Sequence, residues 1–409
     1  MKRYLINLFK NIKFLLNYNF VWHNPKSKKI LVFDDVSYSE IKDMIKRYDH
    51  YVLAVRKENI KQIYISFKII FLTIYYYRGN LFSSYLISLI IIVNPKIVFT
   101  FIDNSFKFME IAKYFKKINS NIKFVALQNG ARYEPLEYEY LFNSRINNKN
   151  LNYSFYLPIL FSFGLYEKDL FKKKKITFKK IIPVGNLRLE NYLIYKNKVH
   201  LKFKKKKQIC FLSEHNNWNK KIELLDKNFV KNYFRLLNFS LRYAKENKYK
   251  IIICSKRYKG NSTLIDNAPH HAEIQSYEKF VNNEYKKFFK SNLIKRNIKD
   301  RFQTYKNMEE SEITIGTMST LLRENLFLKN KIFACNTSKI NIYDFPLKDF
   351  FSSSLDTYDL FEKKITNLIN MPKKRYFNNF KNKIYYLSNN KISTRTKIYS
   401  TLDEILRST

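Results

Sequence analysis

Short apolar runs alternate with longer segments of helical periodicity along most of the chain. In the first half, the runs have the length of buried strands. They lie at residues 29–35, 51–55, 96–103, 123–128, 155–164 and 180–185. Segments of helical length separate several of them, at 63–77, 81–93 and 105–117. Strands that alternate with helices predict a parallel sheet with helices on both faces.

The same rhythm restarts after a lysine-rich stretch near residues 196–207. Further strands are expected at residues 208–214, 250–256, 312–316 and 331–335. The two series predict an α/β fold of two Rossmann-like, doubly wound domains that face a cleft. The expected boundaries are an N-terminal amphipathic segment at 1–28, a first, acceptor-binding domain at 29–198, a second, nucleotide-binding domain at 208–375, and a helical tail at 376–409. Such a tail could cross back onto the first domain.

The N-terminal residues do not resemble a signal peptide, because Lys and Asn interrupt the apolar part. Their apolar side chains fall at helical spacing, which fits a helix that lies on an anionic bilayer or one that packs on its own domain. The apolar stretches at 63–77 and 81–93 are shorter than the roughly 18–20 residues that span a bilayer. We therefore expect a cytoplasmic protein that can associate peripherally with the inner membrane.

Composition adds a strong positive charge, with a formal net charge of +42 at pH 7. Such a charge suggests an anionic partner, such as a nucleic acid, a phosphorylated molecule or a membrane surface. Lys, Asn, Ile, Tyr and Phe are all abundant, and all are encoded by A/T-rich codons. The alternative explanation is therefore that a biased base composition added lysines to the solvent-exposed surface. The lysine runs lack the interleaved glycines and aromatics of RNA-binding signatures, so no specific nucleic-acid partner is expected.

Cysteine usage indicates a reducing compartment. Cys210, Cys254 and Cys335 each lie inside an apolar run. They are expected to be small buried core residues and not a disulfide or zinc set.

Four of the six glycines follow apolar runs closely, and they are Gly130, Gly164, Gly185 and Gly316. The carboxyl ends of parallel strands carry the ligand site in open α/β sheets. Glycine there permits positive φ and close approach of the backbone to a ligand. Tight strand-to-helix turns are the alternative, but four equivalent positions favour a ligand cleft.

The polar turn after residue 316 is the sharpest candidate site. Gly316 and Thr317 end a strand, and Ser319 and Thr320 begin a helix, whose first N–H groups form a seat for phosphate. Glu324 lies about one turn further and could accept hydrogen bonds from ribose hydroxyls. Ordinary helix capping is the alternative.

Residues 319–324 resemble the S-T-x-G-x-E pattern of bacterial glycosyltransferases with two Rossmann-like domains, the GT-B class. The surrounding segments at 95–104, 128–130, 161–164 and 184–186 are similar to a narrower group, the bacterial surface carbohydrate (capsule or O-antigen) biosynthesis proteins. The resemblance covers roughly residues 29–345. Leu322 departs from it, because the group usually has glycine there. Lys256 and Arg257 replace the K-P-H-P turn of related polymer transferases, and no histidine follows the Gln-Asn-Gly turn.

The resemblance implies transfer of a sugar or polyol phosphate from a nucleotide-activated donor to a glycan or lipid-linked glycan. Lys256 and Arg257 would neutralise the diphosphate. The sugar or acceptor would contact five residues, which are Gln128, Asn129, Gly130, Arg132 and Asn186.

The catalytic base is expected from Asp103, Glu134 or His215, with Asp34 and Asp35 as outside choices. No D-x-D triplet occurs in the sequence. This favours metal-independent chemistry without a cofactor, in which basic groups and a helix dipole stabilise the leaving phosphate.

Two other readings remain open. A sugar-nucleotide epimerase or hydrolase of the same fold would turn over the donor without an acceptor. A basic nucleic-acid or membrane-surface binding protein would bind polyanions in a strongly salt-dependent way and have no affinity for nucleotide sugars.

Overall fold

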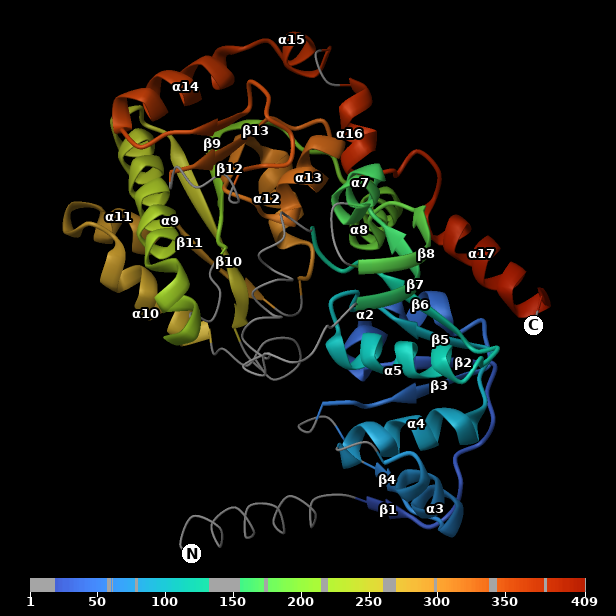
Figure 1. Ribbon diagram of the computed structural model, residues 1–409. Coiled ribbons are helices and arrows are strands. Elements are labelled where there is room, and N and C mark those ends of the chain that lie inside the picture. The colour runs from blue at the N-terminus through green and yellow to red at the C-terminus, as the bar shows by residue number, and fades with distance from the viewer. Residues whose placement is uncertain are drawn as a thin grey trace, which may run out of the picture.

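The computed structural model describes residues 19–56, 60, 62–77, 80–131, 155–172, 176–214, 220–259, 270–297, 300–337, 344–378 and 381–408. These residues form two α/β domains, each built around a six-stranded parallel sheet (Figure 1). The predicted fold class, two Rossmann-like domains, is confirmed. The predicted amphipathic helix falls largely within residues 1–18, which lie outside the described residues.

The first sheet has the order β3-β2-β5-β6-β7-β8, and all its neighbours are parallel. Its strands are β2 (Ile30–Phe33), β3 (His50–Leu53), β5 (Ile97–Thr100), β6 (Lys123–Leu127), β7 (Phe155–Ser162) and β8 (Ile176–Pro183). Every residue of β2 and β5 is buried, so each strand reads as a continuous apolar run. The chain winds from β2 out to β3 and then returns to β5. The order therefore reverses between β2 and β5, which places a crevice at their carboxyl ends.

Helices cover both faces of the first sheet. Alternate residues of β2 point to opposite faces: Leu31 and Phe33 join one buried cluster, and Ile30 and Val32 join another. The helices are α2 (Asp35–Ile45), α3 (Phe67–Tyr75), α4 (Leu81–Val93), α5 (Phe106–Lys117), α7 (Leu165–Lys172) and α8 (Leu187–Lys198). A two-stranded parallel sheet, β1 (Asn19–Val21) with β4 (Gln62–Tyr64), lies beside them.

The second sheet has the order β11-β10-β9-β12-β13-β14. Its strands are β9 (Lys206–Leu212), β10 (Lys250–Lys259), β11 (Leu293–Asn297), β12 (Ser311–Gly316), β13 (Ile332–Asn336) and β14 (Ser352–Ser354). The helices are α9 (Lys220–Glu246), α10 (His270–Phe280), α11 (Lys286–Asn292), α12 (Gln303–Glu310), α13 (Thr320–Phe327) and α14 (Tyr358–Asn370), with a 3-10 turn at Asn283–Tyr285. Here the order reverses between β9 and β12, so the crevice lies at their carboxyl ends.

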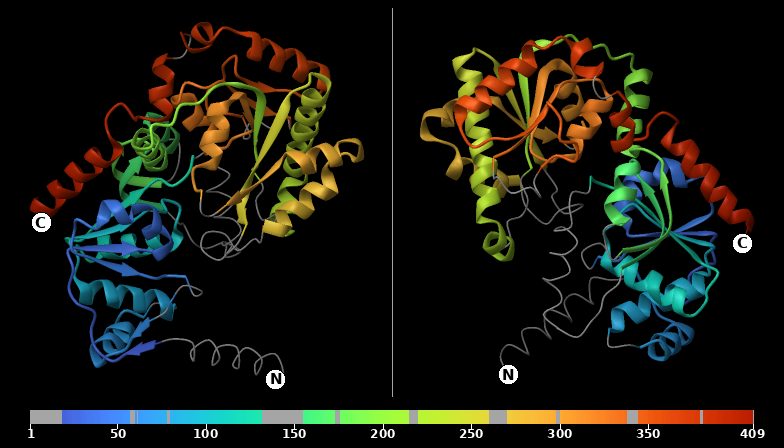
Figure 2. Two further views of the ribbon diagram at one scale, coloured as in Figure 1. Left: turned by 180° about the vertical axis from the view of Figure 1, so that it is seen from behind. Right: turned by 45° about the horizontal axis from the view of Figure 1, so that its top comes forward.

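The tail does cross back onto the first domain. After α15 (Lys373–Asn378) and α16 (Lys381–Leu387), helix α17 (Thr394–Ser408) lies along the first domain in all views (Figures 1 and 2). Ile398, Leu402 and Ile405 of α17 share a buried cluster with residues of β2 and β5.

Two of the four glycines serve this tail, which corrects the prediction that they line a ligand cleft. A Cβ on Gly164 would lie 2.1 Å from the carbonyl oxygen of Tyr386. Gly185 has φ of 100°, and a Cβ there would lie 2.7 Å from Thr394 Oγ1. The prediction of positive φ holds only for Gly185 among the four. Gly164 is therefore required by close packing against the backbone of the tail, and Gly185 by its positive φ and by the side chains of Asn390 and Thr394.

The three cysteines are buried, as predicted. Cys210 and Cys254 lie on neighbouring strands with their sulfur atoms 3.6 Å apart. Burial raises the pKa of the Cys335 thiol well above its ordinary value. Within the described part of the chain, no helix is both long enough and apolar enough to cross a bilayer.

Candidate active site

The carboxyl ends of the two sheets face each other, and the two predicted loops touch. Ala131, in the loop after β6, donates its backbone N–H to Oγ1 of Thr320, the first residue of α13, at 2.8 Å. The Gln-Asn-Gly turn and the start of α13 therefore lie on the same side of the molecule. Figure 1 shows α13 on the side of the second domain that faces the first domain.

Asp103 holds the Gln-Asn-Gly turn at the crevice of the first domain. It follows β5, is buried, and its Oδ1 accepts the backbone N–H of Asn129 at 3.2 Å. The carboxylate therefore fixes the turn that reaches the second domain. Asn129 and Gly130 are half-buried, and Asn129 offers its carbonyl oxygen to Arg188 at 3.3 Å.

The Gln128 side chain is turned into the protein, which corrects the prediction that it is offered to a sugar. Its Oε1 accepts the N–H of Phe163 at 2.7 Å, and its Nε2 donates to the carbonyl oxygen of Gly130 at 2.8 Å and to Oε1 of Glu167 at 3.0 Å. Only 1% of the residue is exposed. Gln128 thus fixes the shape of the turn, and substrate contact by Asn129 and Gly130 stays a prediction.

Arg188 and Asp34 also border the first crevice. Arg188, at the start of α8, lies 3.2 Å from Oε1 of Glu40, and its guanidinium carbon lies 5.3 Å from the ring centre of Phe101. Asp34 directly follows β2 with φ of 80°, caps α2 and accepts a bond from Arg56 at 3.0 Å. A non-glycine residue held in this region is strained, and such residues concentrate at functional sites. Sequence reasoning named Asp34 only as an outside choice and missed Arg188.

In the second domain, a carboxylate occupies the seat predicted for phosphate. Glu214, just after β9, accepts the backbone N–H groups of Thr317 and Met318 through Oε1, at 2.9 and 2.8 Å. A Cβ on Gly316 would lie 3.1 Å from the same oxygen, which explains the glycine. The seat therefore does bind an anionic oxygen, but a donor phosphate would have to displace Glu214. No local pattern points to Glu214, because it lies 103 residues from Thr317 in the sequence.

Ser319 acts as a helix cap, the alternative that the sequence left open. Its side chain accepts the N–H of Leu321 at 3.3 Å at the start of α13. Thr317 is buried and Thr320 is half-buried. The hydroxyl of Thr320, unlike that of Ser319, is directed to the first domain, where it accepts the N–H of Ala131.

Glu324 links the domains. Its Oε1 accepts Nδ2 of Asn186 at 2.5 Å, and its Oε2 accepts the hydroxyl of Tyr305 at 2.5 Å. Asn186 in turn caps α8 through its Oδ1, which accepts the N–H of Arg188 and of Leu189. Both side chains are buried and engaged with each other. A ribose role for Glu324 and a sugar role for Asn186 would need these bonds to exchange, and both roles stay predictions.

A second link between the domains is a buried ion pair that sequence reasoning missed. Arg323 of α13 donates to Oε1 of Glu167 on α7 at 2.6 Å, and the two side chains are 1% and 0% exposed. Glu167 also accepts the N–H of Gly164 at 3.3 Å. Because Glu167 also accepts a bond from Gln128, the ion pair connects α13 of the second domain to the Gln-Asn-Gly turn of the first domain.

Five further residues were predicted to belong to the site. Arg132, Glu134 and His215 lie outside the described residues. Lys256 and Arg257 lie in β10, where the pairing with β11 shifts register between Cys254 and Tyr258. Among the residues that the structure describes, no group of three His, Cys, Asp or Glu side chains is arranged to hold a metal.

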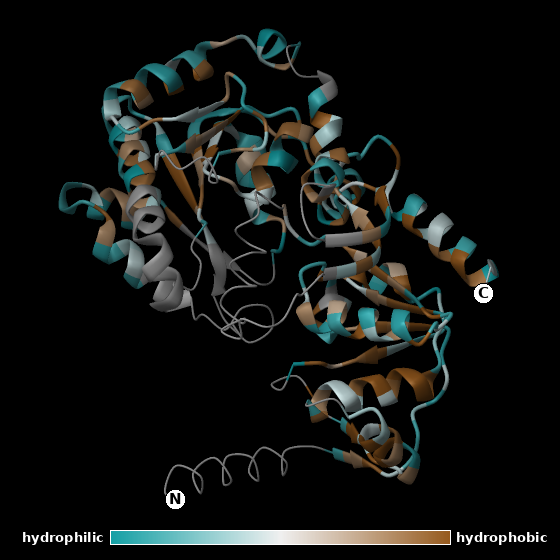
Figure 3. Ribbon diagram, in the orientation of Figure 1, coloured by the Kyte–Doolittle hydropathy of each residue, from teal (hydrophilic) through white to brown (hydrophobic). Residues whose placement is uncertain are grey.

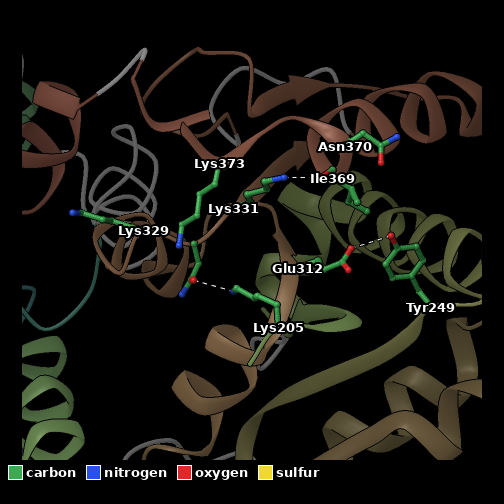
Figure 4. Close-up of a pocket in the computed structure, with 9 residues that line it drawn as sticks. Lys205, Tyr249, Glu312, Lys329, Lys331, Ile369, Asn370 and Lys373 are labelled. Atoms are coloured by element: carbon green, nitrogen blue, oxygen red, sulfur yellow. Dashed lines mark hydrogen bonds between the residues drawn. The ribbon is translucent and has the colours of Figure 1, made fainter. Parts of the chain in front are cut away.

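A pocket of about 470 Å³ lies at the other end of the second sheet, next to the amino ends of β9, β12 and β13 (Figure 4). Lys205, Lys331, Lys373 and Glu312 line it, and Glu312 accepts the Tyr249 hydroxyl at 3.0 Å. Desolvation, with repulsion from Lys373, lowers the pKa of Lys205 to about 8. Because ligands of open α/β sheets bind at the carboxyl ends of the strands, this pocket is not the candidate active site.

Solved structures with two such domains resemble the chain over nearly its whole length. The UDP-GlcNAc 2-epimerase of Neisseria meningitidis bound to UDP-GlcNAc matches with a TM-score of 0.50 and 14% identity, over 92% of this chain and 99% of that one. The MnaA–UDP complex of S. aureus matches with a TM-score of 0.52 and 11% identity, over 93% and 97%. A glycosyltransferase of Rickettsia africae matches at 0.47 with 13% identity, over 94% and 100%, and this weaker likeness carries no argument.

These likenesses show the fold, which is that of the GT-B class. No protein-family model matches the sequence, and no curated protein is detectably similar to it.

Proposed function

We propose that the chain is a GT-B-type glycosyltransferase, or a transferase of sugar or polyol phosphate, that uses a nucleotide-activated donor in bacterial surface polysaccharide synthesis. The contact between Ala131 and Thr320 carries the proposal, because it brings the turn of the first domain to the helix start of the second. A donor bound at α13 would present its sugar to the first domain. The proposed pathway is capsule or O-antigen synthesis, and the support for it is the order of the motifs at 95–104, 128–130, 161–164 and 184–186.

Sugar transfer needs a base for the acceptor hydroxyl and stabilisation of the departing phosphate. Asp103, whose carboxylate accepts the backbone N–H of Asn129 in the Gln-Asn-Gly turn, is the proposed base. The N–H groups of Thr317 and Met318 are proposed to receive the diphosphate after Glu214 leaves, with Lys256 and Arg257 as further positive charge. Because backbone dipoles and basic groups suffice for this, no metal is required by the proposal.

A sugar-nucleotide epimerase or hydrolase is the second candidate. The epimerase of Neisseria meningitidis has the same fold, and the same cleft could turn over a nucleotide sugar alone. The two candidates differ in the need for an acceptor. A glycan or lipid-linked glycan acceptor at the cytoplasmic face of the inner membrane belongs only to the transferase.

Thermal-shift measurements with CMP, CDP, UDP and GDP test nucleotide binding, because a ligand that binds the native state raises the melting temperature. We expect one diphosphate to raise it and its nucleoside to have no effect. Incubation of the matching nucleotide sugar with and without acceptor then separates the candidates. Release of nucleotide only with acceptor supports the transferase, turnover of donor alone supports the epimerase or hydrolase, and no shift with any nucleotide contradicts both.

A further inference from the structure

Helix α3 exposes a more apolar face to solvent than the one it buries. Ile69 and Thr73, four residues apart, are buried against α4, where Thr73 donates to the hydroxyl of Ser88 at 3.2 Å. The outward residues, in contrast, are Phe67 at 94% exposure, Phe71 at 65% and Ile74 at 67%. A surface helix of a soluble domain normally has the opposite arrangement.

Neighbouring residues extend this face. Tyr75 is 70% exposed and stacks on Phe71 with ring centres 6.1 Å apart. Trp22, 75% exposed, follows β1, which pairs with β4 directly before α3. Ser66, the cap of α3, donates to Asn24 at 2.7 Å, so the two segments form one unit. We call this surface the apolar patch, and its residues are Trp22, Phe67, Ile70, Phe71, Ile74 and Tyr75.

The two segments of the sequence that form the apolar patch carry charged side chains of one sign. The sequence contains no Asp or Glu between residues 1 and 33 or between residues 59 and 102. Lys26 and Lys68 are exposed within these two segments. An apolar surface rich in Trp, Tyr and Phe, formed by segments that contain lysine and no acids, is complementary to an anionic bilayer, where aromatic rings occupy the interface and lysines meet lipid phosphate.

The position of the apolar patch leaves the cleft free. Figure 1 shows α3 and β1 at the end of the first domain farthest from the second domain, and Figure 3 shows α3 among the most hydrophobic ribbons. Large exposed apolar surfaces on soluble proteins mark interaction sites. We propose that the apolar patch docks the chain on an anionic membrane by inserting the aromatic residues of α3 and Trp22 into the interface. This goes beyond the proposed function and does not depend on it.

Co-sedimentation of the full-length protein with vesicles tests the proposal. We expect binding to phosphatidylglycerol mixed with phosphatidylcholine, and weaker binding to phosphatidylcholine alone. The double variant Phe67→Ser with Phe71→Ser should lower the partition coefficient on anionic vesicles by about tenfold or more, because it removes inserted rings. The matched control, Leu360→Ser with Ile392→Ser, removes apolar side chains that are 50% and 58% exposed elsewhere, and it should bind as the wild type does.

Fluorescence gives a second readout. The chain has two tryptophans, and Trp218→Phe leaves Trp22 as the single reporter. Its emission should shift to the blue on anionic vesicles and be quenched by brominated lipid.

Equal vesicle binding of the Phe67→Ser/Phe71→Ser variant and wild type would overturn the proposal. The proposal would also be overturned if the wild type were a dimer and this variant a monomer with unchanged vesicle binding. In that case the apolar patch would bind a second copy of the chain and not a membrane. Nucleotide binding by the same variant should be unchanged, so failure here and failure of the proposed function are distinguishable.

Discussion

Arg323 and Glu167 form a buried ion pair across the two domains, with Nη1 and Oε1 2.6 Å apart and both side chains excluded from solvent. The Arg323→Met variant would leave the Glu167 carboxylate buried without its counter-ion. We expect the free energy of unfolding to fall by about 3–5 kcal/mol, measured by denaturant titration. The control, Arg47→Met, breaks the partly exposed pair with Asp403 and should cost at most about 1 kcal/mol. Similar losses in both variants would show that burial does not strengthen the pair.

Gly164 is expected to be intolerant of any side chain. An added Cβ would meet the backbone of Tyr386 and Leu387, which cannot rotate away as a side chain can. Gly164→Ala should therefore lower the stability by about 1–3 kcal/mol and make the tail more sensitive to proteolysis. Gly316→Ala is the milder comparison, because its nearest neighbour is a side-chain oxygen at 3.1 Å. A stable Gly164→Ala variant with a protected tail would contradict the packing described for α16.

Glu214 is expected to compete with a donor phosphate. Its Oε1 holds the two N–H groups at the start of α13, and its charge repels an incoming anion. Glu214→Ala should tighten binding of the recognised nucleoside diphosphate by about tenfold, because charge-assisted bonds to N–H groups become available. Isothermal titration against the wild type measures this, with Asp43→Ala, at an exposed carboxylate of the first domain, as the control. Weaker binding in Glu214→Ala would mean that this carboxylate holds the turn in its binding shape.

Asp103→Asn tests the proposed base. The asparagine keeps an oxygen to accept the Asn129 N–H, so the turn is preserved while the proton-accepting charge is lost. We expect turnover to fall by at least about a hundredfold with donor affinity unchanged. Comparison with Asp103→Ala, which loses the bond as well, separates catalysis from positioning. Full activity of Asp103→Asn would move the role to Glu134 or His215.

Lys205 predicts a pH dependence of stability. Its pKa falls from 10.5 to about 8 on folding, so the unfolded chain binds more protons between these values. The stability contributed by Lys205 should therefore rise as pH increases from 8 to 10.5. The melting temperature of Lys205→Met relative to wild type should accordingly fall over this range. Lys29→Met, at an exposed lysine, should show a constant difference from wild type.

The hydrophobic pattern predicted the central strands because strands buried on both faces read as unbroken apolar runs. It missed β11 and β14, whose polar sequences LIKRN and SSS give no such run at the edges of the second sheet. The glycines and polar turns that follow the apolar runs predicted that the candidate site lies at the carboxyl ends of the strands. Glu214, Glu167 and Arg323 were missed because their partners lie more than 100 residues away, where no local pattern reports the contact.

The return of α17 has a consequence for synthesis of the protein. Ile398, Leu402 and Ile405 fill part of the same buried cluster as β2, which is made near the start of the chain. During translation, the face of the first sheet that α17 covers therefore stays exposed until residues 394–408 have been made. Exposed apolar strands of that kind aggregate readily, so a nascent chain stalled before residue 394 should depend on chaperones far more than the finished protein does.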